Sequence, residues 1–148
     1  MTKTASSVTF AMLIDAQLEA VRDAVHDPAW SKWVPFLKSD TCHGDTAGSD
    51  RVFVMANPDP AMDGYELQEK IVENDRAAGR FAYAITNPPF PVENLGGVVT
   101  TEQTEAGVMA HWTATFDADP ETLEMVRPMM VQSYQVALQG LEAHAKAA

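Results

Sequence analysis

The chain has 148 residues, which is the size of one ordinary domain. Ten lysines and arginines against 21 aspartates and glutamates give a net charge of −11, which argues against binding to nucleic acid or to an anionic membrane surface. Hydrophobic residues make up 46% of the chain, a composition that excludes a disordered or collagen-like protein. We therefore expect one acidic domain spanning residues 1–148.

The cysteine content and the absence of long apolar runs indicate the cellular compartment that we expect for the protein. Cys42 is the single cysteine, so no internal disulfide can form and nothing requires an oxidising environment. The first residues lack the apolar run of a secretory signal, and no stretch approaches the ~18 apolar residues of a membrane span. These features favour a cytoplasmic protein without membrane insertion.

The first third of the chain predicts one strand and two short helices. Apolar residues alternate over 8–14, which indicates a strand. A helix should follow to about His26, with Asp15 as its N-cap and an end before Pro28. The aromatic-rich segment 30–36 predicts a second short helix or a tight connection.

The remainder predicts a run of strands and then a long helix. Pro120 fits a short helical turn near 120–126, and the main helix should start near Pro128 because proline disfavours a helix interior. Such an order predicts an α+β fold, in which a curved antiparallel sheet of six or seven strands wraps around the C-terminal helix. The strands after the first are expected near 37–46, 51–56, 64–74, 79–87, 92–104 and 107–117.

Several local motifs resemble one family. They are Trp30-Ser31-Lys32-Trp33-Val34-Pro35, Gly48-Ser49-Asp50-Arg51-Val52, the Glu69 to Asp75 segment, Arg80 to Leu95 with its Phe90-Pro91-Val92-Glu93-Asn94 core, and His111 to Phe116. Together they resemble the helix-grip (SRPBCC) superfamily of START domains and the birch-pollen allergen, in its polyketide cyclase/dehydrase-like branch. The resemblance implies a cavity for a hydrophobic ligand between the sheet and the C-terminal helix. It does not choose between binding and catalysis.

Glu69 is the most informative polar residue. Period-two alternation places it on the same strand face as Tyr65, Leu67 and Ile71. If that face lines the cavity, burial would raise the pKa of the Glu69 carboxyl, which would then bind a ligand hydroxyl or act in acid–base chemistry. The alternative is a structural link from Glu69 to Arg51, Arg80 or a tyrosine hydroxyl.

Other candidate ligand contacts come from the neighbouring strands and the final helix. Phe81 and Tyr83 share an apolar face, Trp112 lies on another, and His111 points away from it. Gly97, next to Gly96, either widens the cavity or marks a bulge. The complete set of candidate ligand-binding residues is Glu69, Phe81, Tyr83, Leu95, Gly97, Trp112, Met129, Ser133 and Ala137.

We expect a protein that binds a small hydrophobic or amphipathic ligand, such as a lipid, an aromatic or a polyketide-like molecule. One alternative is a cyclase, aromatase or dehydratase that uses Glu69 and Tyr83 as its acid–base pair. The other is an interaction module with a closed cavity. No metal or cofactor is predicted, because the histidines lack ligand spacing and no nucleotide-binding motif is present. The expected oligomeric state is a monomer or a homodimer.

Overall fold

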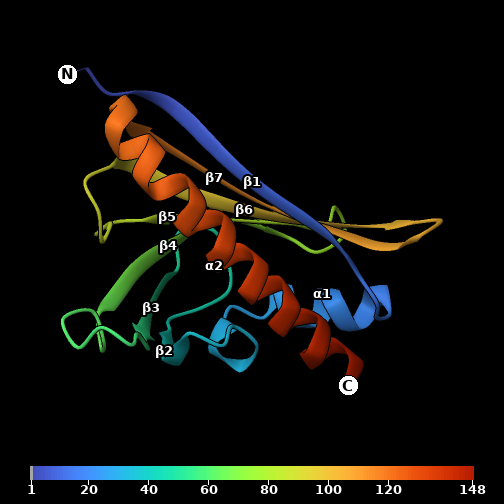
Figure 1. Ribbon diagram of the computed structural model, residues 1–148. Coiled ribbons are helices and arrows are strands. Elements are labelled where there is room, and N and C mark those ends of the chain that lie inside the picture. Colours follow the sequence, from blue (N-terminus) through green and yellow to red (C-terminus); the bar gives the residue numbers. More distant parts are fainter. Residues whose placement is uncertain (1) are drawn as a thin grey trace.

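A computed structural model describes residues 2–148, and Met1 lies outside the described residues. The strands form one antiparallel sheet in the order β1-β7-β6-β5-β4-β3-β2, so β2 to β7 follow each other as a meander and β1 pairs with β7 (Figure 1). The strands are β1 (Thr4–Ile14), β2 (Leu37–Cys42), β3 (Asp50–Met55), β4 (Glu66–Asp75), β5 (Arg80–Ile85), β6 (Glu93–Thr104) and β7 (Gly107–Ala118).

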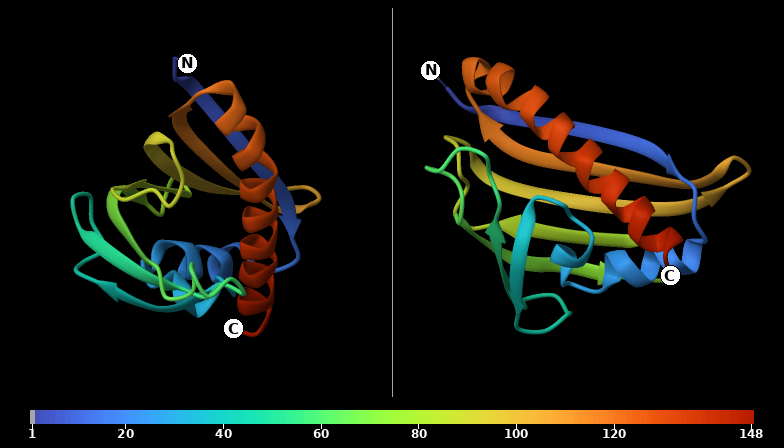
Figure 2. Two further views of the ribbon diagram at one scale, coloured as in Figure 1. Left: turned by 60° about the vertical axis from the view of Figure 1, so that its left-hand side comes forward. Right: turned by 60° about the horizontal axis from the view of Figure 1, so that its bottom comes forward.

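Three helical segments accompany the sheet. They are α1 (Leu18–His26), the one-turn 3-10 helix η1 (Trp30–Lys32) and the long α2 (Pro120–Lys146). Helix α2 crosses the concave face of the sheet, and α1 lies beside the C-terminal half of α2 (Figure 2). The predicted α+β arrangement, a curved sheet gripping a C-terminal helix, is confirmed.

The prediction that the main helix starts near Pro128 is wrong. Helix α2 begins at Pro120. Asp119 is its N-cap, and the Asp119 side chain accepts a hydrogen bond from the Thr122 backbone N–H (2.8 Å). Pro128 then lies inside the helix, on its exposed side. A proline removes one backbone hydrogen bond, but on this side water can solvate the freed carbonyl. Buried Val126 and Met130 hold the helix on the sheet at either side of Pro128.

The prediction that Asp15 is the N-cap of α1 is wrong. The N-cap is Gln17, without a side-chain hydrogen bond. The Asp15 backbone N–H instead donates to Glu142 Oε2 (2.8 Å), and its carboxylate accepts from Lys146 Nζ (3.2 Å). Asp15 therefore links the end of β1 to the end of α2.

The strand predicted over 37–46 is shorter and ends at Cys42. The connection that follows contains Gly44 and Gly48 with φ of 125° and 91°. These conformations are open to glycine and rarely adopted by other residues, so the chain leaves the sheet there. The other strand predictions hold to within a few residues.

Aromatic side chains fill one end of the concave face. Trp30 of η1 packs against Phe81 of β5 and Trp112 of β7, with ring centroids 4.9 and 5.3 Å apart. Its indole N–H donates to the Val25 carbonyl (2.8 Å), and that of Trp33 donates to Ala24 (3.2 Å). The two short helices are thereby fixed to the sheet, and this end of the concave face is closed.

His26 connects α1 to β4. Asn74 Nδ2 donates to the backbone carbonyls of His26 and Asp45, which leaves Asn74 Oδ1 to accept from His26 Nδ1 (2.7 Å). The imidazole is therefore the neutral Nδ1–H tautomer. Its Nε2 is buried and has no hydrogen-bond partner within residues 2–148.

Gly140 sets the closest approach between α2 and η1, which gives a first prediction. A Cβ at this position would collide with the Trp33 carbonyl oxygen and the Pro35 ring. We expect Gly140→Ala to lower the free energy of unfolding by about 1–2 kcal/mol, because the ~1–3 kcal/mol cost of overpacking exceeds the gain of up to ~1 kcal/mol in helix propensity. Urea unfolding measures this, with exposed Gln139→Ala as the matched control. A stabilised Gly140→Ala would contradict it.

A second prediction concerns pH. Burial lowers the pKa of His26 below its ordinary value of 6.5. Below pH 6.5 the native state therefore binds fewer protons at this site than the unfolded chain, so stability falls as pH decreases. We expect the free energy of unfolding to fall less between about pH 7.5 and 5.5 in His26→Gln than in the wild type. His111→Gln should keep the wild-type dependence, and equal slopes in all three proteins would contradict the assignment.

Candidate functional site

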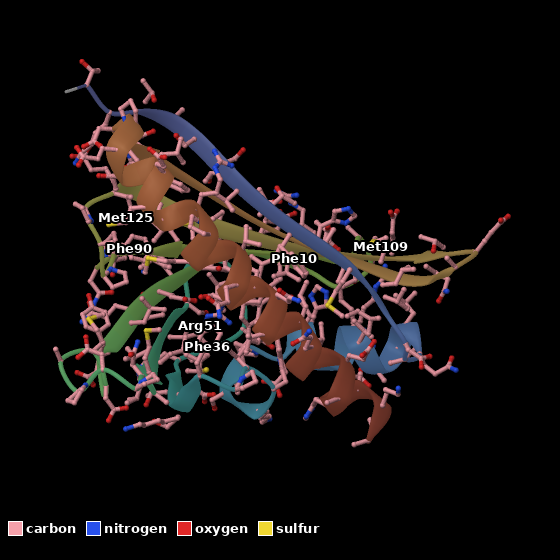
Figure 3. The ribbon with its side chains drawn as sticks, in the orientation of Figure 1. Phe10, Phe36, Arg51, Phe90, Met109 and Met125 are labelled. Atoms are coloured by element: carbon pink, nitrogen blue, oxygen red, sulfur yellow. The ribbon has the colours of Figure 1, made fainter. Side chains whose placement is uncertain are left out.

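A cavity of about 380 Å³ lies between the sheet and the N-terminal half of α2. Its walls are mainly apolar and include Phe36, Phe53 and Leu95. Its mouth lies among α2, the β3–β4 loop (residues 56–65) and the β5–β6 loop (residues 86–92), which contribute Met62 and Phe90. Phe90 packs in one cluster with Val126 and Met130 of α2, and in the view of Figure 3 Phe36 lies below it, near β2. The volume lies at the small end of the range for ligand-binding pockets.

A buried ion pair lies at the inner end of this cavity. Arg51 on β3 and Glu69 on β4 are direct cross-strand partners, and Arg51 Nε donates to Glu69 Oε1 (2.8 Å). Their side chains are only 0% and 5% exposed. Glu69 lines the cavity, whereas Arg51 lies behind it. The pair matches the structural link considered for Glu69 and, at the same time, places its carboxylate at the cavity wall.

The Arg51 guanidinium lies in an aromatic cage. It lies 4.0 Å from the Trp30 ring centroid, 4.8 Å from those of Phe53 and Phe81, and 5.4 Å from that of Tyr83. Arg51 Nη1 donates to the Pro28 carbonyl (3.0 Å), and Nη2 has no hydrogen-bond partner within residues 2–148. Cation–π attraction partly replaces the lost hydration. The cage holds the cation still and away from the cavity.

Two tyrosines bring hydroxyl groups to the same cavity. Tyr83 on β5 accepts a hydrogen bond from Trp112 Nε1 (2.9 Å), so its own O–H remains available as a donor. Tyr134 on α2 stacks on Trp112 with ring centroids 4.8 Å apart and planes 10° apart. Within residues 2–148 the Tyr134 hydroxyl has no hydrogen-bond partner, yet it is not fully enclosed. It therefore faces the cavity.

Burial changes the acidity of all three groups. It raises the pKa of the Glu69 carboxyl, while the Arg51 cation acts in the opposite direction. It raises the pKa of Tyr83 and of Tyr134 well above the ordinary value of 10, and the nearby Glu69 charge adds to both shifts. The two phenols consequently stay protonated at neutral pH and act as hydrogen-bond donors.

Six of the nine residues predicted to contact ligand line the cavity. These are Glu69, Tyr83, Leu95, Trp112, Met129 and Ser133. Met129 lies at the rim, because its side chain is 51% exposed.

Phe81, Ala137 and Gly97 do not line the cavity. Phe81 and Ala137 are fully buried, Phe81 beneath Trp30 and Ala137 in the core. Gly97 faces the Tyr83 ring, and a Cβ there would collide with the phenol. It therefore makes room for Tyr83 and neither widens the cavity nor forms a bulge, since the bulge in β6 lies between Glu93 and Gly96.

The sequence analysis missed Tyr134, Met130 and Trp30 as cavity residues. The sequence analysis placed the ligand contacts of the helix on the stripe Met129, Ser133 and Ala137, which are spaced i, i+4, i+8. The inner face of α2 is centred instead on Met130, Tyr134 and Leu138, an i, i+4, i+8 pattern that the sequence contains. Trp30 joins the wall through η1, and its contacts with the distant strand residues have no local sequence signal.

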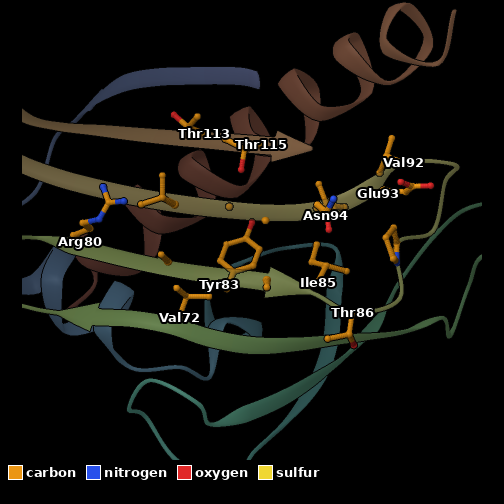
Figure 4. Close-up of a pocket in the computed structure, with 17 residues that line it drawn as sticks. Val72, Arg80, Tyr83, Ile85, Thr86, Val92, Glu93, Asn94, Thr113 and Thr115 are labelled. Carbon is orange, nitrogen blue, oxygen red and sulfur yellow. The ribbon is translucent and has the colours of Figure 1, made fainter. Parts of the chain in front are cut away.

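A second, more open groove of about 890 Å³ lies on the outer side of the sheet (Figure 4). Its floor consists of small residues such as Ala82, Ala84 and Gly96. Tyr83 is directed from β5 toward β6 and also borders this groove, because Gly97 has no side chain to cover it (Figure 4). The Arg80 guanidinium at its edge is paired with Glu73 (2.6 Å) and so does not serve the inner cavity.

Residues 2–148 contain no group of three or more histidine, cysteine or acidic side chains placed to hold a metal ion. Within the same residues, no helix is long and apolar enough to cross a membrane.

The buried pair gives a third prediction. We expect Glu69→Gln to lower the free energy of unfolding by about 3–5 kcal/mol, because Arg51 cannot lose its charge and would be left buried without a counter-ion. The double variant Arg51→Met/Glu69→Leu should recover most of this loss. Glu73→Gln, in the exposed pair with Arg80, is the matched control and should change stability far less. Denaturant unfolding at pH 7 tests this, and equal losses for Glu69→Gln and Glu73→Gln would contradict it.

Comparison with solved structures supports the fold. A protein from Thermobifida fusca superposes with a TM-score of 0.78 at 28% identity, covering 92% of this chain and 90% of its own. An uncharacterised protein from Bacillus thuringiensis gives 0.76 at 24% identity over 93% and 97%, and XoxI from Bacillus cereus gives 0.73 at 23% over 98% and 96%. The last two likenesses concern the fold alone.

One family model matches nearly the whole chain, and no curated protein matches it. The model described as polyketide cyclase/dehydrase and lipid transport matches residues 5–146. The motifs that run from the Trp30 segment to His111–Phe116, the gripped C-terminal helix and the apolar cavity agree with this match. The chain belongs to the polyketide cyclase/dehydrase and lipid transport family of the SRPBCC helix-grip superfamily.

Proposed function

We propose that this protein binds a small hydrophobic or amphipathic ligand in the cavity between the sheet and α2. The observation that carries the proposal is the combination of an apolar cavity with three polar groups that are not fully used by the protein itself. They are the Glu69 carboxylate and the Tyr83 and Tyr134 hydroxyls, from β4, β5 and α2. A few convergent polar groups in an apolar pocket are the usual composition of a ligand site.

The geometry favours burial of a flat ligand against aromatic rings. Trp112 and Tyr134 form one stacked pair, and Phe36, Phe53 and Phe90 supply further rings around the same space. Aromatic walls bury large areas and allow offset or edge-to-face stacking. Met62, Met129 and Met130 lie toward the mouth and the α2 side, where flexible thioether side chains adapt to ligands of different shape.

Acid–base catalysis by Glu69 and Tyr83 is the weaker candidate. An effective general acid or base has a pKa near the working pH. Burial moves the pKa of Tyr83 away from neutrality, and the Glu69 carboxylate is held by a permanent cation. A closed interaction module is disfavoured by the cavity itself, which opens between two loops and α2.

The fourth prediction tests binding at this cavity. Ligand that binds only the native state stabilises it by about 2.7 kcal/mol at a hundredfold excess over Kd. We expect thermal stabilisation by members of a panel of neutral aromatics, fatty alcohols and polyketide-like phenols, and we expect native mass spectrometry to show one bound molecule. Ser133→Phe, which fills the cavity, should abolish both effects.

Gln135→Phe is the matched control for that experiment, because Gln135 is exposed on the opposite side of α2. It introduces the same ring in the same helix without entering the cavity and should bind as the wild type does. Absence of any ligand after denaturing extraction, together with no shift across the panel, would overturn the proposal. Equal binding by Ser133→Phe and the wild type would place the ligand elsewhere.

A further inference from the structure

We infer that the ligand enters with an uncharged hydroxyl group, of the phenol, enol or alcohol type, at its buried end, and that carboxylate ligands are rejected. This inference rests on the proposed function and specifies its ligand class. It follows from what each polar group at the inner end of the cavity still has to offer.

Glu69 offers a hydrogen-bond acceptor. Its Oε1 is occupied by Arg51 Nε, whereas Oε2 has no hydrogen-bond partner within residues 2–148 and is not fully enclosed by protein. Since Glu69 lines the cavity, Oε2 is the atom that a ligand meets. An acceptor in an apolar site requires a donor from the ligand, because a buried polar group without a partner is costly.

Arg51 keeps that acceptor ionised and is itself out of reach. The guanidinium is always protonated, and Glu69 is the carboxylate that pairs with it. Protonation of Glu69 would leave the caged cation buried without a counter-ion, which is strongly unfavourable. Arg51 is fully buried and is not among the residues that line the cavity, whereas Trp30, Phe53 and Tyr83 of its cage are. A carboxylate ligand would therefore face the charge of Glu69 without gaining contact with the cation.

Tyr134 completes the match to a hydroxyl group. Its phenol has no hydrogen-bond partner within residues 2–148, and burial keeps it protonated, so it donates to a ligand oxygen. Both groups line the same cavity, and the Glu69 charge is near enough to contribute to the raised pKa of Tyr134, so we expect one ligand hydroxyl to donate to Glu69 Oε2 and to accept from Tyr134. An ether oxygen can only accept and leaves Glu69 without a donor.

Three probes of one ring system separate these cases: 2-naphthol, 2-methoxynaphthalene and 2-naphthoate, titrated at pH 7 by isothermal calorimetry. We expect 2-naphthol to bind about tenfold or more tightly than 2-methoxynaphthalene, since a hydrogen bond to a charged group has at least this effect. Binding of 2-naphthoate should be weaker still. Equal or tighter binding of the ether or of the carboxylate, relative to the naphthol, would overturn the inference.

Failure of the inference and failure of the proposed function give different results. If none of the three probes binds and the wider panel also fails, the cavity does not bind ligand at all. If 2-methoxynaphthalene binds at least as well as 2-naphthol, the cavity works and the assigned hydroxyl preference is wrong. The wild-type protein alone decides between these outcomes.

Two variants then assign the preference to Glu69. Arg51→Met/Glu69→Leu removes the acceptor without leaving a buried charge unpaired, so it is expected to fold, and it should bind 2-naphthol and 2-methoxynaphthalene with similar affinity. Glu73→Gln changes a carboxylate of the same strand whose partner is the exposed Arg80, and it should keep the wild-type preference. A preference that persists in the double variant would contradict the role of Glu69.

Discussion

The interior of this protein is organised around one buried cation. Arg51 brings a permanent charge into the concave face of the sheet, and a charge in that position requires both a counter-ion and close contacts. Glu69 provides the first from the neighbouring strand, and four aromatic rings provide the second. Because Trp30 is the closest of these rings, the position of η1 depends on the same group. The pair thus connects strand pairing, helix placement and the polarity of the cavity.

Closure of one end of the concave face leaves a cavity at the other end. Trp30 of η1, Trp33 directly after it and the C-terminal half of α2 fill the space over Phe81 and Val99. The remaining space lies under the first half of α2, where the exposed Pro128 lets the helix continue across the mouth of the cavity. A single helix thereby supplies core packing with its C-terminal half and Ser133 and Tyr134 of the cavity wall at its middle.

The sequence and the structure agree most closely where the pattern is local. Alternation placed Glu69, Tyr83 and Trp112 on apolar strand faces, and in the structure these faces are the inward ones. The start of α2 was predicted wrongly, because a proline inside a helical pattern usually marks a helix boundary. Whether Pro128 does so depends on whether water can reach the carbonyl that it leaves without a hydrogen bond. Independently of the helix start, the predicted inner stripe of Met129, Ser133 and Ala137 lies one residue away from the stripe of Met130, Tyr134 and Leu138 that faces the sheet.

The sequence by itself determined the order of the elements, the alternating faces of the strands and the membership of a helix-grip family. Tertiary structure decided which residues share the cavity. The contact of Arg51 with Glu69 depends on the register between β3 and β4. The burial of Phe81 depends on its contact with Trp30 of η1, which lies far away in the sequence. Periodicity describes a segment relative to its own axis, whereas a site is made by distances between segments that only packing fixes.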